Sequence, residues 1–188
     1  RYVICASWKW LGEKTIHHVS VLDDQKRYTK DHGDDRHVLE TLHHVLSSAD
    51  VIVAHNGDSF DTKYVATRML YHGLPPLPPI PSIDTCTTAK NRFKFNSNKL
   101  DYLGQFLQVG RKKPTTSGLW LRILRGETRA IREIVRYNVQ DVALLERVFI
   151  KLRPYIANHL NRQLFGLTGC PRCGSSKVQS RGLHRAIS

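Results

Sequence analysis

The longest periodic segment of the sequence, residues 127–152, constrains the fold most. Its apolar side chains recur at the three- and four-residue spacing that places them on one face of an α-helix. These side chains are Ile131, Ile134, Val135, Val142, Leu145, Val148, Phe149 and Leu152. Proline cannot continue a helix, so we expect this one to end near Pro154. The pattern predicts an amphipathic helix with one apolar face to bury.

The segments before this helix alternate between strand and helix patterns. Runs rich in β-branched and aromatic residues flank a Gly-Glu turn near the start and indicate a strand hairpin. A short apolar run further on is typical of a strand buried on both faces. We expect strands over residues 2–10, 15–22 and 51–54, and helices over residues 34–48, 59–72, 84–93, 100–109 and 119–124. Asp34 or Asp35 is the expected N-cap of the first helix. This order predicts an α/β domain in which helices cover a sheet.

Five prolines in residues 74–81 predict an extended crossing segment there. The segment separates two halves of different charge. Residues 1–85 carry 9 basic and 11 acidic side chains, whereas residues 86–188 carry 20 and 5. A net charge of −2 beside one of +15 points to a polyanion that meets the second half, most economically nucleic acid. The alternative is a basic, solvated face with no partner.

Length and apolar content bound the class of protein. The 188 residues suit one globular domain with a small appendage, and we expect a domain over residues 1–160 and a basic tail over residues 161–188. The longest apolar runs fall far short of the roughly 20 residues that a membrane-spanning helix requires, so we expect no membrane partner. Cys5 and Cys86 lie in patterns where reduced thiols pack well, and we expect a reducing, cytoplasmic location.

Two polar clusters could carry chemistry. Residues 56–61 leave the buried strand and enter a helix, and in open α/β sheets sites form at the carboxyl ends of strands. Tyr137 and Asp141 lie four residues apart in the long helix, which places the phenol and the carboxylate on one face. Each aspartate also has a purely structural interpretation. Asp61 could cap its helix, and Asp141, sheltered by apolar neighbours, could pair with an arginine of its own helix instead of a divalent cation. The arginines in reach are Arg136 and Arg147.

The order of the two clusters adds a resemblance. Asn-x3-Phe-Asp (Asn56 to Asp61) after a strand, followed about 80 residues later by Tyr-x3-Asp (Tyr137 to Asp141) in a helix, resembles the second and third motifs of the DEDD 3'-to-5' exonucleases. The tyrosine places it in the branch with tyrosine in the third motif, and the closest likeness is to phage-type and YprB-like proteins. Residues 83–85 and 97–103 look like the segments between those motifs. The resemblance covers roughly residues 1–155 and implies a ribonuclease-H-like mixed sheet flanked by helices.

The resemblance also implies a mechanism. In this family, two Mg²⁺ or Mn²⁺ ions held by four carboxylates bracket the scissile phosphate of a nucleic acid. Asp61 and Asp141 match two of those ligands. Tyr137 matches the tyrosine that orients the attacking water, and Asn56 matches the asparagine that shapes the loop. The implied substrate is the 3' end of single-stranded DNA or RNA rather than a duplex.

The first family motif is missing. It is an Asp-x-Glu on the opening strand that supplies the other two carboxylates, and no Asp-x-Glu occurs in this sequence. Because residues 1–10 look like the strand that follows that motif, we expect the motif to lie upstream of Arg1. The motif strand is normally internal to the sheet, so the chain without it is expected to carry an exposed sheet edge. The alternative is a degenerate protein that has lost its metal site.

Cys170 and Cys173 form a C-x2-C knuckle of the kind that holds half of a tetrahedral Zn²⁺ site. Zinc needs four ligands, and the sequence has no second cysteine pair after this one. The interpretation as a zinc half-site therefore stands beside that of a metal-free tail.

Two basic segments are candidates for nucleic-acid binding. Arg92 and Lys94 alternate with phenylalanines, as in surfaces that stack bases beside phosphates, although an ordinary helix end with buried phenylalanines has the same pattern. Lys112 and Lys113 lie in a basic loop. The sequence thus predicts a metal-dependent 3'-to-5' exonuclease, with a non-catalytic nucleic-acid-binding module on the same fold as the main alternative. A protein-binding adaptor is the third possibility.

Overall fold

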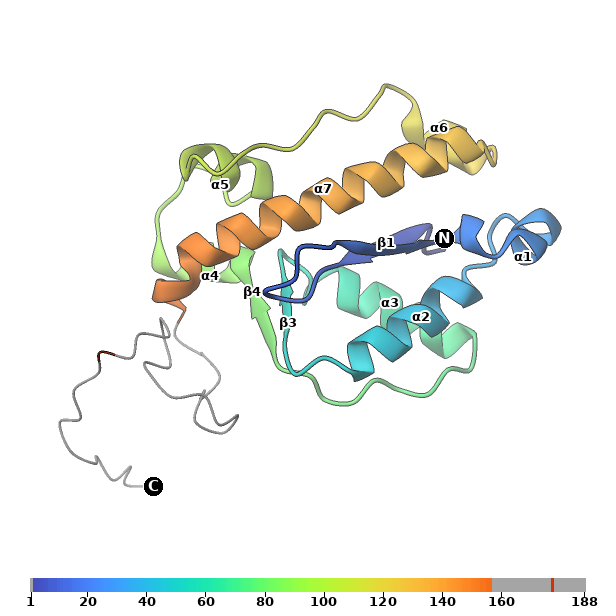
Figure 1. Cartoon of the computed structure of the whole chain (residues 1–188), viewed down its shortest axis with the longest axis horizontal. Coiled ribbons are helices and arrows are strands. Elements are labelled where there is room, and N and C mark those ends of the chain that lie inside the picture. Colours follow the sequence, from blue (N-terminus) through green and yellow to red (C-terminus); the bar gives the residue numbers. More distant parts are fainter. Residues whose placement is uncertain (1, 157–176, 178–188) are drawn as a thin grey trace.

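In the computed structural model, residues 2–156 and residue 177 are described (Figure 1). The predicted tail over residues 161–188, including Cys170 and Cys173, therefore lies outside the described residues apart from Lys177. The elements in chain order are β1 (Cys5–Trp8), β2 (His17–Ser20), η1 (Val21–Asp23), α1 (Gln25–Lys30), α2 (Arg36–Ser47), β3 (Ile52–Ala54), α3 (Asp61–Tyr71), β4 (Ser82–Asp84), α4 (Thr85–Arg92), α5 (Leu100–Phe106), α6 (Leu119–Leu124), α7 (Thr128–Leu152) and η2 (Arg153–Tyr155).

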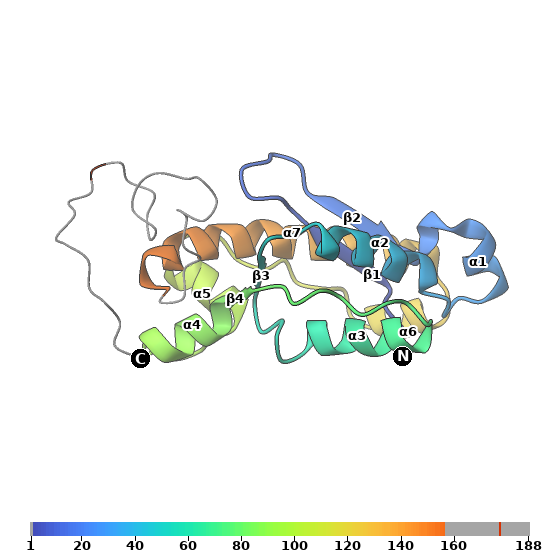
Figure 2. The same cartoon turned by 90° about the horizontal axis from the view of Figure 1, so that it is seen from below.

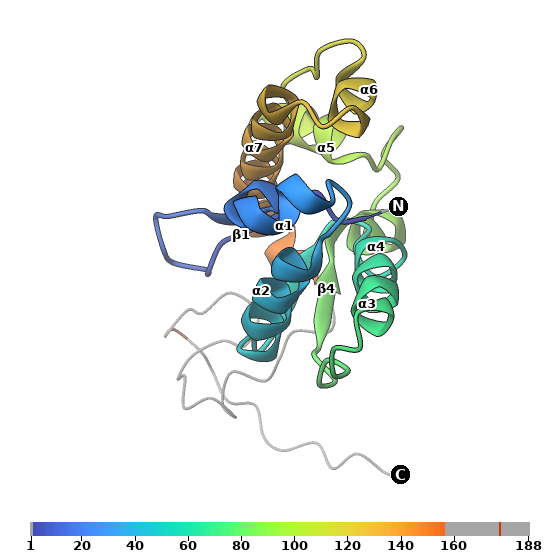
Figure 3. The same cartoon turned by 90° about the vertical axis from the view of Figure 1, so that its right-hand side faces the viewer.

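The two strands near the start pair as the predicted hairpin. β1 and β2 are antiparallel, with Cys5 opposite Ser20 and Trp8 opposite His17. The turn between them uses Gly12 at a positive φ of 97°, a conformation that glycine adopts without steric cost. α7 packs on one side of the hairpin and α2 on the other, which gives three layers (Figures 1 and 3).

A second pair of strands forms a separate sheet. β3 and β4 are parallel, with Val53 opposite Ile83 and Ala54 opposite Asp84, so both strands end at the same edge. From the sequence we expect a helix to begin at residue 84 and no strand at β4. A single mixed sheet was also expected, whereas the described residues form two sheets of two strands each. The reason is that none of the described strands lies between the two pairs to join their edges.

The long helix organises the core. α7 contacts β1, β2, α4, α5 and α6, and its length spans the described part of the molecule (Figures 1 and 2). Its amino-terminal half packs against the hairpin and α6, and Ile131 shares a core cluster with Val38 and Leu39 of α2; all three are completely buried. Its carboxyl-terminal half packs against α4 and α5, around Leu103 and Val148, which are also fully buried. The predicted apolar face is thus confirmed as the link between the two ends of the core.

Several helix boundaries differ from expectation for identifiable reasons. α5 ends three residues early because Gln108 and Gly110 take positive φ values of 56° and 134° and turn the chain. η1 and α1 were not predicted, since they are short and have no apolar period. Local capping bonds define them, with the Ser20 hydroxyl accepting from the Leu22 amide and the Asp24 carboxylate accepting from the Arg27 amide.

The start of α2 also departs from the expected cap. Asp35 occupies the N-cap position, but its side chain makes no capping hydrogen bond. The fully buried Asp35 carboxylate instead accepts hydrogen bonds from the Val3 amide at 2.7 Å and from the Arg68 guanidinium at 2.7 and 2.9 Å. His72 Nε2 lies 2.7 Å from the same carboxylate. This cluster ties the segment before β1 to α2 and α3, and Arg68 holds the pKa of Asp35 below its usual range although burial opposes ionisation.

None of the helices that the structure describes has the length and apolar character that a bilayer span requires.

Candidate functional site

The loop from β3 to α3 holds Asp61 at the first position of α3. Asn56 in this loop has a positive φ of 64°, which lets the chain reverse directly after the strand. Gly57 follows, and a Cβ at this position would lie 2.5 Å from the Cβ of Ala54. The loop therefore needs a glycine here because of packing. Asp61 makes no capping bond at the start of α3, so the structural interpretation of Asp61 as a helix cap is wrong.

Asp84 is a buried carboxylate that sequence reasoning did not include among the site residues. It ends β4 and caps α4, where Oδ1 accepts from the amides of Cys86 at 2.8 Å and Thr87 at 3.1 Å. The same oxygen accepts from the Asn56 amide at 3.0 Å, which fixes the β3–α3 loop to the end of β4. The sequence signals are the likeness of residues 83–85 to a segment between the family motifs and an aspartate before a threonine-rich stretch, which predicts a cap but not its contact with the loop.

Burial raises the pKa of Asp61 above its ordinary value, and the nearby charge of Asp84 adds to the shift. Asp61 is nevertheless accessible to solvent. A carboxylate that is disfavoured as an anion by its surroundings is a good ligand for a cation that restores the charge balance.

Asp141, the second predicted ligand, lies on α7 and pairs with Lys112. The Lys112 Nζ donates to Asp141 Oδ2 at 2.6 Å, with 29% and 19% of the two side chains exposed. Among the described residues, neither arginine suggested by the sequence, Arg136 or Arg147, pairs with Asp141. The cation comes instead from the loop between α5 and α6, 29 residues away in sequence.

Tyr137 lies one helical turn before Asp141 and shares the same lysine. The Lys112 Nζ is 5.3 Å from the centre of the Tyr137 ring, within the range of a cation–π contact. The backbone amide of Lys112 donates to Asp101 Oδ1 at 2.7 Å, which anchors the loop to α5. The structure therefore brings Tyr137, Asp141 and Lys112 together.

The ion pair has opposing effects on its two members. Burial raises the pKa of Asp141, and Asp101 adds to this, while Lys112 acts in the opposite direction. For Lys112, burial alone would lower the pKa, but the bond to Asp141 raises it above its usual value. Burial thus disfavours the ionised form of Asp141, and the Lys112 ammonium favours it.

His55 connects the two carboxylate regions. Its Nδ1 lies 2.9 Å from the Thr85 hydroxyl, and its Nε2 lies 2.9 Å from the Asn98 carbonyl oxygen, which can only accept. Burial lowers the pKa of His55, while the Asn98 carbonyl and the charge of Asp84 oppose that shift. His55 is also close enough to Asp141 to affect the pKa of that carboxylate. Electrostatic effects on the pKa values thus link Asp61 to Asp84, Asp84 to His55 and His55 to Asp141, without a hydrogen bond or ion pair between these side chains among the described residues.

The donor atoms suit part of a Mg²⁺ or Mn²⁺ site. Asp61 and Asp141 offer the carboxylate oxygens that these ions prefer. The described residues contain no group of three or more His, Cys, Asp or Glu that could hold a metal ion. The donor set is therefore incomplete within residues 2–156. The predicted Zn²⁺ ligands Cys170 and Cys173 lie outside the described residues.

The remaining cysteines fit their expected packing roles. Cys5 and Cys86 are free thiols, and Cys86 is buried. Burial raises the pKa of Cys5 to about 12, which leaves it a protonated, unreactive thiol at neutral pH.

The segment with Arg92 and Lys94 is an ordinary helix end with packed phenylalanines. The Phe93 ring lies 5.1 Å from Phe95 and 5.0 Å from Tyr155, and both phenylalanines pack on the core around α5. These contacts fit the packing alternative, although both rings stay partly exposed, and nucleic-acid binding by this segment stays a prediction. Arg92 and Lys94 themselves are exposed.

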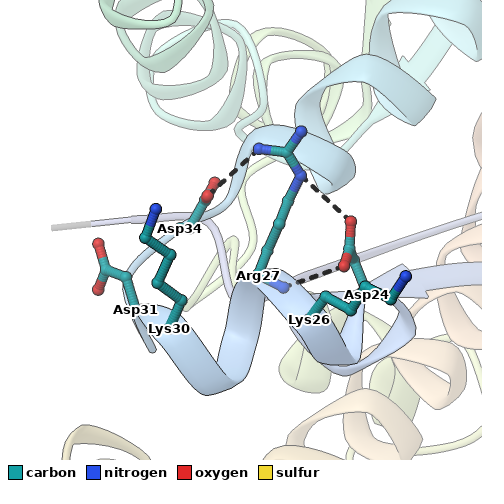
Figure 4. Close-up of a pocket in the computed structure, with 6 residues that line it drawn as sticks. All are labelled: Asp24, Lys26, Arg27, Lys30, Asp31 and Asp34. Carbon is teal, nitrogen blue, oxygen red and sulfur yellow. Dashed lines mark hydrogen bonds and ion pairs between the residues drawn. The ribbon is translucent and has the colours of Figure 1, made fainter.

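Two hollows in the described surface differ in their relation to the site. The larger, of about 610 Å³, lies along α1 and the loop after it and is lined by acidic and basic residues, with Arg27 shared between Asp24 and Asp34 (Figure 4). It lies at the opposite end of the molecule from α4 and α5 (Figure 1). The smaller, of about 310 Å³, adjoins Tyr137 and the basic loop.

Comparison with known proteins agrees with this fold. Residues 11–153 match the RNase_H_2 family of the RNase_H superfamily. No curated protein matches the sequence significantly. The match covers β2, the β3–β4 pair, all of α7 and every predicted catalytic residue. Membership indicates a nucleic-acid-related function, with nucleic acid as the class of substrate. The chain belongs to the RNase_H superfamily.

Proposed function

We propose that this chain is a metal-dependent 3'-to-5' exonuclease domain of the DEDD type, in the branch with tyrosine in the third motif. The observation that carries the proposal is the cluster on α7. Tyr137 and Asp141 lie one helical turn apart, half-buried, and both contact a single cation, the Lys112 ammonium. A Tyr-x3-Asp pair on one helix face that contacts a cation has the chemistry that this motif requires.

Each residue has a proposed role. Bound Mg²⁺ or Mn²⁺ would neutralise the scissile phosphate and lower the pKa of a water nucleophile. Asp61 and Asp141 would hold the ions through carboxylate oxygens. The Tyr137 hydroxyl would orient the attacking water, because its ring is fixed by the helix and lies beside Lys112. Asn56 would keep the β3–α3 loop in the shape that presents Asp61.

One observation favours the alternative of a non-catalytic nucleic-acid-binding module. Lys112 already neutralises Asp141, and residues 2–156 hold no group of three metal ligands. The resemblance assigns two further carboxylates to an Asp-x-Glu, a pattern that this sequence lacks. Two carboxylates would bind an ion weakly, whereas a two-metal site needs more.

A digestion experiment separates these functions. A 5'-labelled single-stranded oligonucleotide is incubated with the chain in Mn²⁺, in Mg²⁺ and in EDTA. Under the proposal, products shorten one nucleotide at a time from the 3' end, only with metal, and Asp61→Asn and Asp141→Asn abolish the ladder. The control variant is Asp58→Asn, which removes an exposed carboxylate from the same loop.

Each outcome of the digestion supports or contradicts one of the two candidate functions. A metal-dependent ladder that persists in Asp58→Asn and disappears in Asp141→Asn supports the exonuclease. Binding of the oligonucleotide without cleavage in any metal supports the binding module. Cleavage that is unchanged in both Asp61→Asn and Asp141→Asn contradicts the assigned site. Tyr137→Phe should slow cleavage without preventing metal binding, since it removes only the hydroxyl.

A further inference from the structure

The smaller hollow is a cleft between the basic loop and α7. It has a volume of about 310 Å³ and is lined by Lys113, Pro114, Thr115, Glu133, Arg136, Tyr137 and Gln140. The loop is attached at both of its ends. Lys112 binds Asp101 and Asp141 on one side, and the Thr116 hydroxyl donates to Glu133 on the other. Residues 113–115 therefore span the face of α7 between two fixed points, and the cleft under them is present before any ligand binds.

The charges around the cleft favour an anion. Lys113 and Arg136 are both exposed, and neither has an ion pair within the described part of the chain. The carboxylate in the wall, Glu133, is already engaged by Thr116 and by the Arg122 guanidinium at 3.4 Å. Two uncompensated cations thus face a wall whose negative charge is balanced, which leaves the cleft positive.

The other lining groups suit more than a bare phosphate. Within the described structure the Gln140 side chain makes no hydrogen bond, so its amide offers both donors and an acceptor to a ligand. Tyr137 and Pro114 supply apolar surface on which a sugar or base can rest. The volume lies at the lower end of the range of small-molecule sites, which fits a single nucleotide.

The position of the cleft connects it to the proposed site. Tyr137 lines the cleft and is also the residue that contacts Lys112 beside Asp141. A nucleotide in the cleft would therefore lie next to the proposed hydrolytic residues and on the same side of α7. Arg136 and Gln140 flank Tyr137 and Asp141 in sequence, so one helix would present both the hydrolytic and the binding groups.

We propose that this cleft binds one nucleotide of a single-stranded nucleic acid, with the phosphate between Lys113 and Arg136 and the nucleoside against Tyr137, Pro114 and Gln140. The proposal rests on the proposed function for its substrate class. It assigns roles in binding to Arg136 and Gln140, which the motifs do not.

The test measures binding in the absence of metal, so that it does not depend on cleavage. Fluorescence anisotropy of a labelled single-stranded oligonucleotide is followed in EDTA at salt concentrations from about 50 to 200 mM. The variants are Arg136→Gln and Gln140→Ala. The matched control is Arg132→Gln, an exposed arginine one turn earlier on the same helix that does not line the cleft.

Arg136→Gln should weaken binding roughly 5- to 20-fold, as expected for the loss of one charge-assisted hydrogen bond. It should also flatten the log-log salt slope by about 0.7, the value for one phosphate of a single strand. Arg132→Gln should change affinity less than about twofold. Thymidine 5'-monophosphate should compete with the oligonucleotide, and thymidine should compete far less, because the phosphate supplies the ionic contacts.

The outcomes separate this proposal from the proposed function. Equal losses in Arg136→Gln and Arg132→Gln overturn the cleft and leave the exonuclease proposal intact. A loss confined to Arg136→Gln and Gln140→Ala supports the cleft even if no metal produces cleavage. Failure of the unmodified chain to bind the oligonucleotide at low salt overturns both.

Discussion

Replacing Lys112 by methionine should expose how strongly Asp141 depends on a neighbouring cation. Methionine keeps most of the apolar stem of lysine but removes the ammonium that lies 2.6 Å from Asp141 Oδ2. Breaking a fully buried ion pair costs about 3–5 kcal/mol, and leaving a polar group unsatisfied costs about 1–3 kcal/mol. Because 19% of the Asp141 side chain is still exposed, we expect a loss near 2 kcal/mol at neutral pH.

This loss should depend on pH in a defined direction. In Lys112→Met the main opposition to the effect of burial on Asp141 is gone and only the influence of His55 remains, so the pKa of Asp141 in the folded state should rise further above the unfolded value. A group with a raised carboxylate pKa destabilises the folded protein while it is ionised and stops doing so once it is protonated. The difference in stability between the unmodified chain and the variant should therefore shrink as the pH falls from neutral through the raised pKa.

Thermal unfolding in EDTA measures the effect, with Lys113→Met as the matched control from the same loop. About 2 kcal/mol corresponds to a decrease in Tm of roughly 4–8 °C for a domain of this size, and the exposed Lys113 should give almost none. Mn²⁺ at ten times its Kd for Lys112→Met should stabilise this variant by about 1.4 kcal/mol, because the ion takes the place of the ammonium. The unmodified chain should be stabilised less. A Tm for Lys112→Met equal to that of Lys113→Met, together with an identical response to Mn²⁺, would refute this account of the site.

Three further predictions concern the packing and charge around the site. Gly104→Ala should lower the urea midpoint, because a Cβ there would lie 2.7 Å from the Gly110 carbonyl oxygen and 2.8 Å from Leu144 Cδ1. The cost of overpacking, about 1–3 kcal/mol, outweighs the gain in helix propensity of about 1 kcal/mol. A higher midpoint would contradict the close α5–α7 contact. Thr85→Val should cost about 1–3 kcal/mol in chemical denaturation, since the fully buried hydroxyl binds both His55 and the Ala54 carbonyl, whereas Thr85→Ser should keep most of the stability. Asp61→Asn should raise the Tm in EDTA at pH 7, because the raised pKa of Asp61 means that its charge destabilises the folded state. This gain in Tm should decline toward acidic pH, where Asp61 of the unmodified chain becomes protonated. A decrease in Tm at pH 7 would show that the carboxylate stabilises the fold.

The periodic elements could be predicted from the sequence, because their signals are local. α7 and α6 match the expected ranges within one residue, and the hairpin forms as predicted. β4 could not be recognised in this way. It has three residues, it follows a proline segment, and it exists because Ile83 pairs with Val53 across about 30 residues of chain. β3 is equally short, but it lies in a continuous apolar run, whereas β4 has one apolar residue between two polar ones.

The site was predictable to the extent that its motifs are local. Tyr137 and Asp141 share a helix face because of their spacing, and they do lie together around Lys112. The identity of the cation was not predictable, because the sequence favours arginines on the same helix. Lys112 reaches Asp141 only because Asp101 anchors the loop and positive φ values at Gln108 and Gly110 turn it back toward α7. The Asp101 bond and the approach of the loop to α7 are tertiary contacts, which a local sequence pattern does not predict.

The Lys112–Asp141 pair gives the two candidate functions a common physical basis. An ammonium at 2.6 Å compensates the charge of the half-buried Asp141 carboxylate, which a divalent ion could also do. In an enzyme, the ion has to displace the ammonium, and Lys112 is then free to meet the phosphate that arrives with the substrate. In a binding module, the ammonium stays and Asp141 is only its counter-ion. The response of Lys112→Met to Mn²⁺ distinguishes these states, because Mn²⁺ stabilises the variant only if Asp141 can accept a metal once its lysine is removed.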